Sequence, residues 1–584
     1  MLGLVSVLLL AASAAGGPLL KLDCGRAEGV LNASTGVAAF KGIPYAMPPL
    51  GDLRFAKTVS LREGGGCWAP SVWNASKFGD DCMQSGQFNQ GGAEDCLFIN
   101  TWIPSWGSQE GGAGRPVMVY SYGGDLTDGR SSSYDMAWLA ERTGHVIVSM
   151  NYRVNLFGFL ALRELSAEAP SGASGNFGFW DQLEALRWVQ TNAAALGADR
   201  SRVTFFGQSS GGTSVFALLA APLARGTFSR AISLSGSANL TMGLREAESQ
   251  NVPIAKALGC DAQPHGPRST PAGVVACLRN LSALDVQAAV PASWNTVKAL
   301  WSLPPPEAAK DARGMAYQGI AIVDGELVTA PLRDALRQGT NPMPFIVSSL
   351  AEEADAQPGM VVSGMDAAAF EALTDASLDA WGAGTGAEVR RAYGYDDGKA
   401  TGAPAQLVYD SIMTDYGQTC ASVSVVADAS RGFAKAAAEA GDPAPAVYQM
   451  YVSARPTHPV WGFDATYQPR YAFHSLDILA GLGHWDLWSA GRGKPAYQPE
   501  HRDTLLRDAI AEVFGNFTRD GALSSSEGWQ VAGAGCPGGL ASPSCYTAVN
   551  VTDGGVAVPT RQLREDICTL WSSLGFDERF WWSN

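Results

Sequence analysis

The chain has 584 residues, of which 46% are hydrophobic and 17% are charged. This balance is typical of a soluble globular protein with a sizeable core and excludes an intrinsically disordered chain. The formal net charge of −15 opposes electrostatic binding to nucleic acid or anionic lipid, because both partners are negatively charged.

The N-terminus begins with a short apolar run, Leu2–Leu10, followed by small residues at 12–14. This pattern is typical of a secretory signal peptide and its cleavage site, although no Lys or Arg precedes the run. The run is too short to span a bilayer comfortably, and no other stretch predicts a transmembrane segment. We therefore expect residues 1–14 to be removed and residues 15–584 to form one secreted domain.

Two further features suit a secreted chain. Ten cysteines without a C-x-x-C pair predict disulfides rather than zinc ligands, and they could form five bridges. Acceptor sites for N-linked glycan begin at Asn32, Asn74, Asn239, Asn280, Asn516 and Asn550.

Between residues 117 and 237, short apolar runs alternate with helical patterns, which predicts β-α-β units. Such units form a parallel sheet with helices on both faces and a site at the carboxyl ends of the strands. Helical spacing is clearest over Asp181–Leu196. The predicted strands are Val117–Tyr120, Val146–Met150, Val203–Phe206 and Ala231–Leu234.

The third of these strands runs directly into Gly207-Gln208-Ser209-Ser210-Gly211, and a helical pattern follows. This G-x-S-x-G string is typical of a nucleophile elbow, a strained turn in which only small residues fit two positions either side of the serine. Ser209 is therefore a candidate nucleophile for acyl transfer. The loop Ser121–Asp125 after the first strand carries two glycines, so the amides of Gly124 and Asp125, with that of Ser210, are candidates for an oxyanion hole.

Residues 259–318 and 364–403 are rich in Ala and in short helical fragments, and we interpret them as helical insertions over the sheet. Four tryptophans could line access to the site, although core packing is the commoner role of such residues. They are Trp301, Trp381, Trp461 and Trp485.

A serine nucleophile needs a base that is oriented by a carboxylate, and in this fold the chain order is Ser, acid, His. A predicted strand at 344–350 is followed by Glu352 and Glu353, and composition does not choose between them. Four of the six histidines follow in the chain, at 458, 474, 484 and 501. His474 lies in a polar turn after the predicted strand Val447–Val452 and is the preferred base, with His484 as the main alternative.

Four further motifs complete the pattern: Phe40–Phe55, Glu94–Asn100, Asn151–Leu160 and Gly175–Gln182. With the elbow, they resemble the type-B carboxylesterase and cholinesterase-like family over about residues 29–571. The resemblance implies an α/β-hydrolase fold, in which helical insertions lie over the active site of a large, mostly parallel sheet.

The resemblance also implies Ser209, Glu353 and His474 as a catalytic triad, with Ser235 supporting the acid and base. It implies three disulfides, Cys82 to Cys96, Cys260 to Cys277 and Cys420 to Cys568. The four remaining cysteines are paired by proximity and elimination, which gives Cys24 with Cys67 and Cys536 with Cys545.

Three departures from the family pattern bear on specificity. Asp125 stands where the oxyanion loop usually has a third glycine, Gln208 replaces a common Glu, and Ser210 replaces a small Ala. The segment from Cys82 to Cys96 is short and holds no Trp, so the usual cation-π partner of a choline ester is missing, and little material is available for a lipase lid.

These observations predict a serine carboxylester hydrolase that acts on small or soluble esters through an acyl-enzyme on Ser209 and needs no cofactor. The alternative from another class is a cholinesterase-like binding or adhesion protein without turnover. Within the enzymes, the alternatives are a lipase or a cholinesterase. The sequence leaves the oligomeric state open.

Overall fold

The computed structural model describes residues 17–85, 90–107, 114–295, 303–306, 309, 319–356, 365–395, 404–462, 467–489, 492–524, 547–554, 557–561 and 563–576. The predicted signal peptide, Trp301, Cys536 and Cys545 lie outside these residues.

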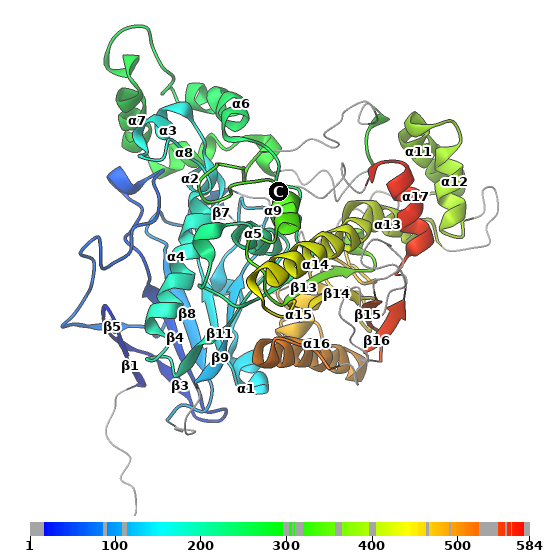
Figure 1. Cartoon of the computed structure of the whole chain (residues 1–584), viewed down its shortest axis with the longest axis horizontal. Helices are drawn as coiled ribbons and strands as arrows, with labels where there is room; N and C mark the ends of the chain where they lie inside the picture. The colour runs from blue at the N-terminus through cyan, green and yellow to red at the C-terminus, as the bar shows by residue number, and fades with distance from the viewer. Residues whose placement is uncertain are drawn as a thin grey trace, which may run out of the picture.

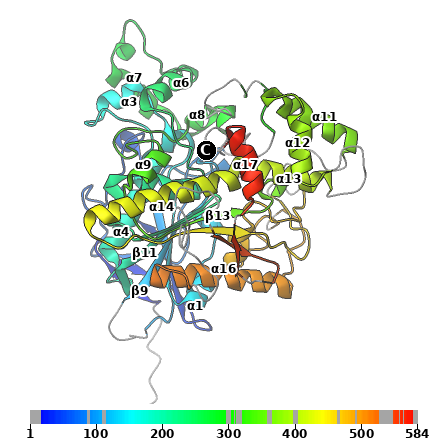
Figure 2. The ribbon, with the colours of Figure 1, turned by 45° about the vertical axis from the view of Figure 1, so that its right-hand side comes forward.

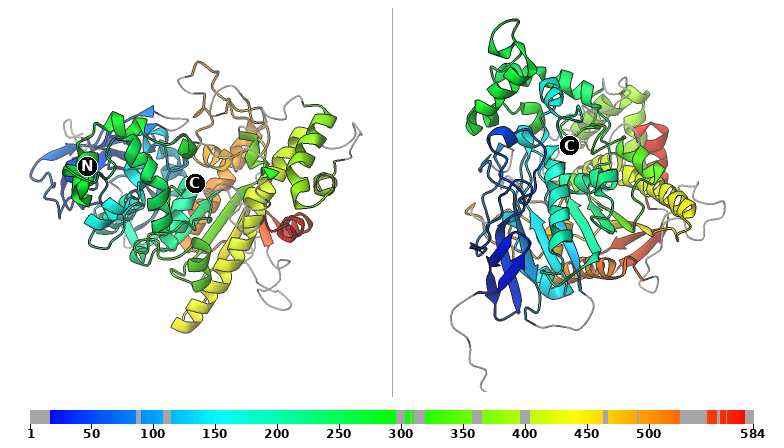
Figure 3. Two further views of the ribbon diagram at one scale, coloured as in Figure 1. Left: turned by 90° about the horizontal axis from the view of Figure 1, so that it is seen from above. Right: turned by 60° about the vertical axis from the view of Figure 1, so that its left-hand side comes forward.

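The fold is built on one large sheet, which over the described residues has the order β16-β15-β14-β13-β12-β11-β9-β10-β8-β4-β3. Seen from above in Figure 3, the chain crosses the molecule from its blue N-terminal strands to its red C-terminal end. The strands are β3 (Val30–Asn32), β4 (Val37–Pro44), β8 (Phe98–Ile103), β9 (Arg115–Ser121), β10 (Val146–Met150), β11 (Ala198–Gln208), β12 (Arg230–Leu234), β13 (Phe345–Leu350), β14 (Val447–Val452), β15 (Thr547–Val551) and β16 (Ala557–Arg561).

The centre of the sheet is parallel and its edges are antiparallel. The pairs that run from β10 through β9, β11, β12, β13 and β14 to β15 are parallel, whereas β8, β4, β3 and β16 join antiparallel. Every residue of β10, β13 and β14 is buried, as expected for parallel strands that are covered on both faces. The predicted strands and the α/β class are confirmed.

Helices cover both faces of the sheet. On one face α5 packs on β11 and β12, and α14 packs on β13 and β14; on the other face α16 packs on β9 and β11. Figure 2 shows α14 and α16 on opposite sides of the strands. The helices beside the sheet are α1 (Ala137–Thr143), α2 (Asn155–Phe159), α4 (Phe177–Asn192), α5 (Ser210–Leu219), α9 (Leu332–Gln338), α13 (Ala405–Thr414), α14 (Cys420–Ala440), α15 (Leu476–Gly481), α16 (His501–Asp520) and α17 (Glu565–Ser573).

The two predicted insertions are helical, and Figure 1 shows them at the upper left and the upper right of the molecule. The described residues contain no helix that is long and apolar enough to cross a bilayer. The first predicted insertion contains α7 (Pro271–Asn280) and α8 (Ala283–Ala288), and the second contains α11 (Ala367–Leu378) and α12 (Thr385–Ala392). Two helices from before residue 259, α3 (Arg163–Glu168) and α6 (Leu244–Ala257), lie beside the first insertion.

Helix α4 begins at Phe177, four residues before the start that the sequence pattern predicted. The preceding Asn176 adopts a left-handed backbone conformation with φ of 53°. Its side-chain amide donates to the Ile322 carbonyl and to Asp324, each at 2.8 Å. A segment distant in the sequence therefore fixes the start of this helix.

The described residues contain four disulfides. They join Cys24 to Cys67, Cys82 to Cys96, Cys260 to Cys277, and Cys420 to Cys568.

Candidate active site

Ser209 stands at the junction between β11 and α5, with backbone angles φ 59° and ψ −128°. A non-glycine residue with positive φ is strained, which is typical of a nucleophile at a strand-to-helix turn. A Cβ at Gly207 would collide with the backbone of Gly211, and a Cβ at Gly211 would collide with that of Ser121. The two glycines therefore allow the sharp turn.

Glu353 and His474 form a buried pair. His474 Nδ1 lies 2.6 Å from Glu353 Oε2, and both side chains are almost fully buried. Glu353 Oε1 accepts hydrogen bonds from Ser235 Oγ at 2.6 Å and from the Leu350 amide at 2.9 Å. These contacts hold the carboxylate toward the imidazole, so Nδ1 carries the proton and Nε2 presents its lone pair as an acceptor.

The neighbouring carboxylate, Glu352, has other partners. Its two oxygens accept from the Arg455 guanidinium at 2.9 Å and from the Ala472 amide at 3.0 Å. Burial raises the pKa of Glu352, an effect that the charge of Arg455 opposes. Glu352 thus anchors the segment that leads to His474, and it is Glu353 that contacts the base.

Three other histidines make side-chain contacts away from Ser209. His484 Nε2 lies 2.9 Å from the Asp135 carbonyl, and His458 lies 2.6 Å from Glu500 at the surface. His145 bonds the Gly515 carbonyl. None of these residues lines the cavity that contains Ser209.

Gln208 makes a contact that the sequence did not predict. Its side-chain Nε2 lies 3.0 Å from His474 Nε2, and both residues are 3% exposed. Because Nδ1 faces Glu353, the amide of Gln208 donates to the lone pair of Nε2. The base nitrogen that would take a proton from Ser209 is therefore bonded to Gln208 in this structure.

The glycine-rich loop after β9 lies on the other side of Ser209. Its first residue, Tyr122, stacks on Tyr152 with ring centroids 4.4 Å apart, and Tyr152 Oη donates to the Tyr122 carbonyl. Gly124 and Asp125 then take φ values of 123° and 57°. Ser210 is the first residue of α5, so its N–H has no partner within the helix.

Asp125 brings a carboxyl group to this loop. Burial, and then the nearby charge of Asp128, raise the pKa of Asp125 to about 8. The group is consequently neutral at pH 7 and gains a negative charge as the pH rises through about 8.

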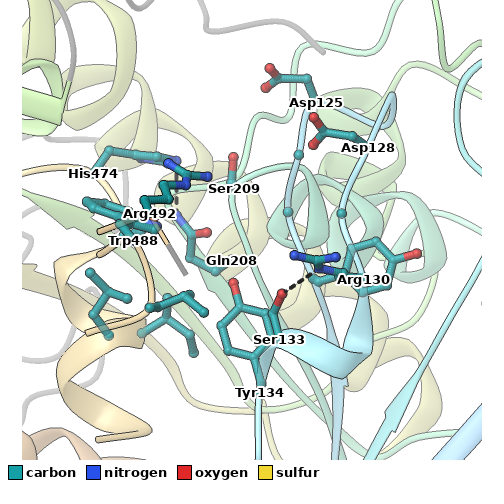
Figure 4. Close-up of a pocket in the computed structure, with 18 residues that line it drawn as sticks. Asp125, Asp128, Arg130, Ser133, Tyr134, Gln208, Ser209, His474, Trp488 and Arg492 are labelled. Atoms are coloured by element: carbon teal, nitrogen blue, oxygen red, sulfur yellow. Dashed lines mark hydrogen bonds between the residues drawn. The ribbon is translucent and has the colours of Figure 1, made fainter. Parts of the chain in front are cut away.

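A single cavity joins these parts. In Figure 4, His474, Trp488 and Arg492 lie on one side of Ser209, and Asp125 and Asp128 lie on the other. The predicted residues that line it are Gly124, Asp125, Ser209 and His474; Tyr134, Trp488, Arg130 and Arg492 also line it and were not predicted.

The described tryptophans proposed to line the site lie elsewhere. Trp381 packs against Phe576, Trp485 stacks on Tyr497, and Trp461 lies under the Lys494 ammonium. Trp488, three residues beyond Trp485, lines the cavity instead. No local pattern distinguishes these two tryptophans in the sequence.

A parallel sheet with a serine at a strand-to-helix elbow, followed by an acid and a histidine after later strands, defines the α/β-hydrolase class. The chain belongs to the carboxylesterase family, whose sequence model matches residues 17–533.

Several characterised proteins are similar to parts of this chain. Fumonisin B1 esterase of Sphingopyxis macrogoltabida is 39% identical over 226 residues, which are 37% of this chain and 40% of that protein. Acetylcholinesterase of Gallus gallus is 36% identical over 301 residues, 47% of this chain and 36% of the relative. Cholinesterase of Mus musculus is 39% identical over 245 residues, which are 39% of this chain and 38% of that protein. The matches thus span less than half the length of each relative.

Proposed function

We propose that the protein is a secreted serine carboxylester hydrolase that acts on small or soluble esters, with Ser209, His474 and Glu353 as its triad. One observation carries this proposal. Buried contacts run unbroken from Ser235 through Glu353 to His474, and His474 lines the same cavity as the strained Ser209. Membership of the carboxylesterase family gives independent support.

In the first half of the reaction, His474 Nε2 takes the proton of Ser209 while Oγ bonds to the ester carbonyl carbon. The amides of Gly124, Asp125 and Ser210 stabilise the resulting oxyanion. The alcohol leaves with the proton from His474, and the acyl group stays on Ser209. Water, activated by the same base, then releases the acid, and no cofactor takes part.

This proton transfer requires an exchange of hydrogen bonds. His474 Nε2 has one lone pair, and Gln208 contacts it at 3.0 Å. The Gln208 amide must release that lone pair before Ser209 can donate to it. Gln208 is therefore a positioning residue that competes with the nucleophile in the resting enzyme.

The short segment closed by the Cys82–Cys96 disulfide supports the proposed substrate range. It holds no Trp to bind a quaternary ammonium group, which disfavours choline esters. It also offers little material for a large lid, which disfavours emulsified long-chain lipids.

Export from the cell is supported by the four disulfides, which form in oxidising compartments. Among the glycan acceptor sites, Asn32, Asn74 and Asn280 are exposed. Asn550 is instead partly buried, and its Oδ1 accepts hydrogen bonds from the amide and hydroxyl of Ser453.

The direct test is hydrolysis of p-nitrophenyl acetate and butyrate by the wild-type protein and by Ser209→Ala, with circular dichroism to verify folding. We expect turnover that Ser209→Ala abolishes, and weaker activity on long-chain emulsions and on choline esters. A folded wild-type protein without turnover would favour the binding or adhesion alternative. A preference for emulsions or choline esters would favour a lipase or a cholinesterase.

A further inference from the structure

Arg492 brings a positive charge into the cavity that holds Ser209 and His474. The residue is exposed, and among the described residues its guanidinium has no ion pair and no hydrogen bond. Figure 4 shows it on the same side of the cavity as His474 and Trp488. An arginine that meets no carboxylate in the described part of the chain, and that lines the same cavity as Ser209, is available to bind a ligand.

The other cavity arginine is already engaged. Arg130 lies 3.4 Å from Asp81 and 3.1 Å from Ser133 Oγ. Its charge is therefore balanced by a carboxylate, whereas that of Arg492 is balanced by none in the described part of the chain. This difference singles out Arg492 within the cavity.

The two carboxyl groups that line the cavity lie away from Arg492. Asp125 and Asp128 lie across Ser209 from Arg492. Asp125 is protonated below pH of about 8, because burial and the nearby charge of Asp128 raise its pKa to that value. Asp128 is thus the one charged carboxyl group among the described residues that line the cavity. The chain as a whole carries −15, so Arg492 is a local exception in a protein that otherwise repels anions.

We propose that Arg492 binds a carboxylate on the substrate, so that the enzyme prefers half-esters of dicarboxylic acids to neutral esters of equal length. This inference rests on the proposed esterase function. The planar guanidinium suits bidentate pairing with a carboxylate. The buried side chains of Ile478, Leu479 and Trp488 line the same cavity and can pack against the methylene groups that separate the carboxylate from the ester.

Two chromogenic esters with four-carbon acyl groups test this inference: the mono-p-nitrophenyl ester of succinic acid, which is anionic, and p-nitrophenyl butyrate, which is neutral. We expect Arg492→Gln to lower kcat/KM for the succinate ester by about 10–100-fold, the range for a lost charge-assisted hydrogen bond. Hydrolysis of the butyrate should change by less than about twofold, because the neutral chain has no partner for a guanidinium. Arg492→Lys should retain part of the preference.

Lys494→Gln is the matched control, since it removes a positive charge two residues away that lies over Trp461 and outside the cavity lining. It should leave the ratio of the two kcat/KM values unchanged. Equal losses for both esters in Arg492→Gln, or no loss for either, would overturn the inference while leaving the esterase function intact.

If the wild-type protein hydrolyses neither ester, the esterase function itself fails. The inference is then decided by calorimetric binding of the succinate half-ester to wild-type protein and to Arg492→Gln. Binding that depends on Arg492 would support it, and equal or absent binding would overturn it.

Discussion

The two sides of the cavity differ in how their polar groups are held. On the base side, Glu353 has partners at both oxygens, from Ser235, the Leu350 amide and His474. On the opposite side, the loop carries positive φ values at Gly124 and Asp125 and a carboxyl group whose pKa is raised to about 8. Packing therefore holds Glu353 and His474 in place, whereas the charge on the Asp125 side of the cavity changes with pH.

The largest effect should come from breaking the base side. Glu353→Gln keeps the shape of the side chain but removes the charge that holds the His474 proton at Nδ1. We expect kcat/KM for p-nitrophenyl butyrate to fall by roughly 10³–10⁴-fold, as expected when a triad acid is neutralised. Steady-state kinetics on folded protein would measure it.

Glu352→Gln is the matched variant, because the two oxygens of Glu352 bond Arg455 and the Ala472 amide and not the imidazole. Its loss of activity should be far smaller. Comparable losses in the two variants would contradict the assignment of Glu353 as the acid.

A smaller effect should appear on the oxyanion side when the pH is raised. Asp125 is neutral below pH of about 8, and above it the carboxylate would oppose the negative oxyanion. A repulsion of about 1.4 kcal/mol corresponds to a tenfold loss. We therefore expect kcat/KM of the wild-type protein to fall about tenfold as the pH rises through that value.

Asp125→Gly and Asp125→Asn cannot acquire this charge and should keep a flat profile over the same pH range. Parallel alkaline losses in the wild-type protein and both variants would show that another group causes the decline. Asp125 has a positive φ of 57°, which glycine adopts without strain. Comparison of the glycine variant with the asparagine variant therefore separates the effect of backbone strain from that of charge.

The smallest change in rate should come from removing the contact between Gln208 and His474. Gln208→Met removes the hydrogen bond to His474 Nε2 but keeps a side chain of similar length. The net contribution of a hydrogen bond is about 0.5–1.5 kcal/mol. Because this bond competes with Ser209, its removal should make the reaction of Ser209 with an organophosphonate ester roughly 2–10-fold faster. Stopped-time labelling followed by mass spectrometry would measure the rate.

Gln449→Met is the control, because Gln449 is a buried glutamine in β14 that lies outside the cavity lining. It should leave the labelling rate unchanged. Slower labelling of Gln208→Met would mean that Gln208 assists the base and does not compete with the nucleophile.

Much of the fold could be predicted because its signals are local. Runs such as Val146–Met150 are apolar throughout, as expected for strands with both faces covered, and the glycines of the elbow have a steric reason that is visible in the sequence. The start of α4 could not be predicted, because Asn176 is held by Ile322 and Asp324, which are distant in the sequence.

The candidate site divides in the same way. Chain order and the position after a strand limited the acid to Glu352 or Glu353, and the family resemblance favoured Glu353. In the structure Glu353 contacts His474, whereas Glu352 contacts Arg455. The cavity wall was missed because it depends on the path of the chain after α15, which turns Trp488 to the cavity and stacks Trp485 on Tyr497. Sequence spacing carries no information about that path.

The central claim is that Ser209 is the nucleophile of an ester hydrolase. The most direct measurement is reaction with an organophosphonate ester, followed by intact mass and peptide mapping of wild-type protein and Ser209→Ala. We predict one adduct per chain, on Ser209, that is absent from the variant and accompanied by loss of ester hydrolysis. A folded wild-type protein without an adduct, or an adduct on another residue with hydrolysis intact, would contradict the claim.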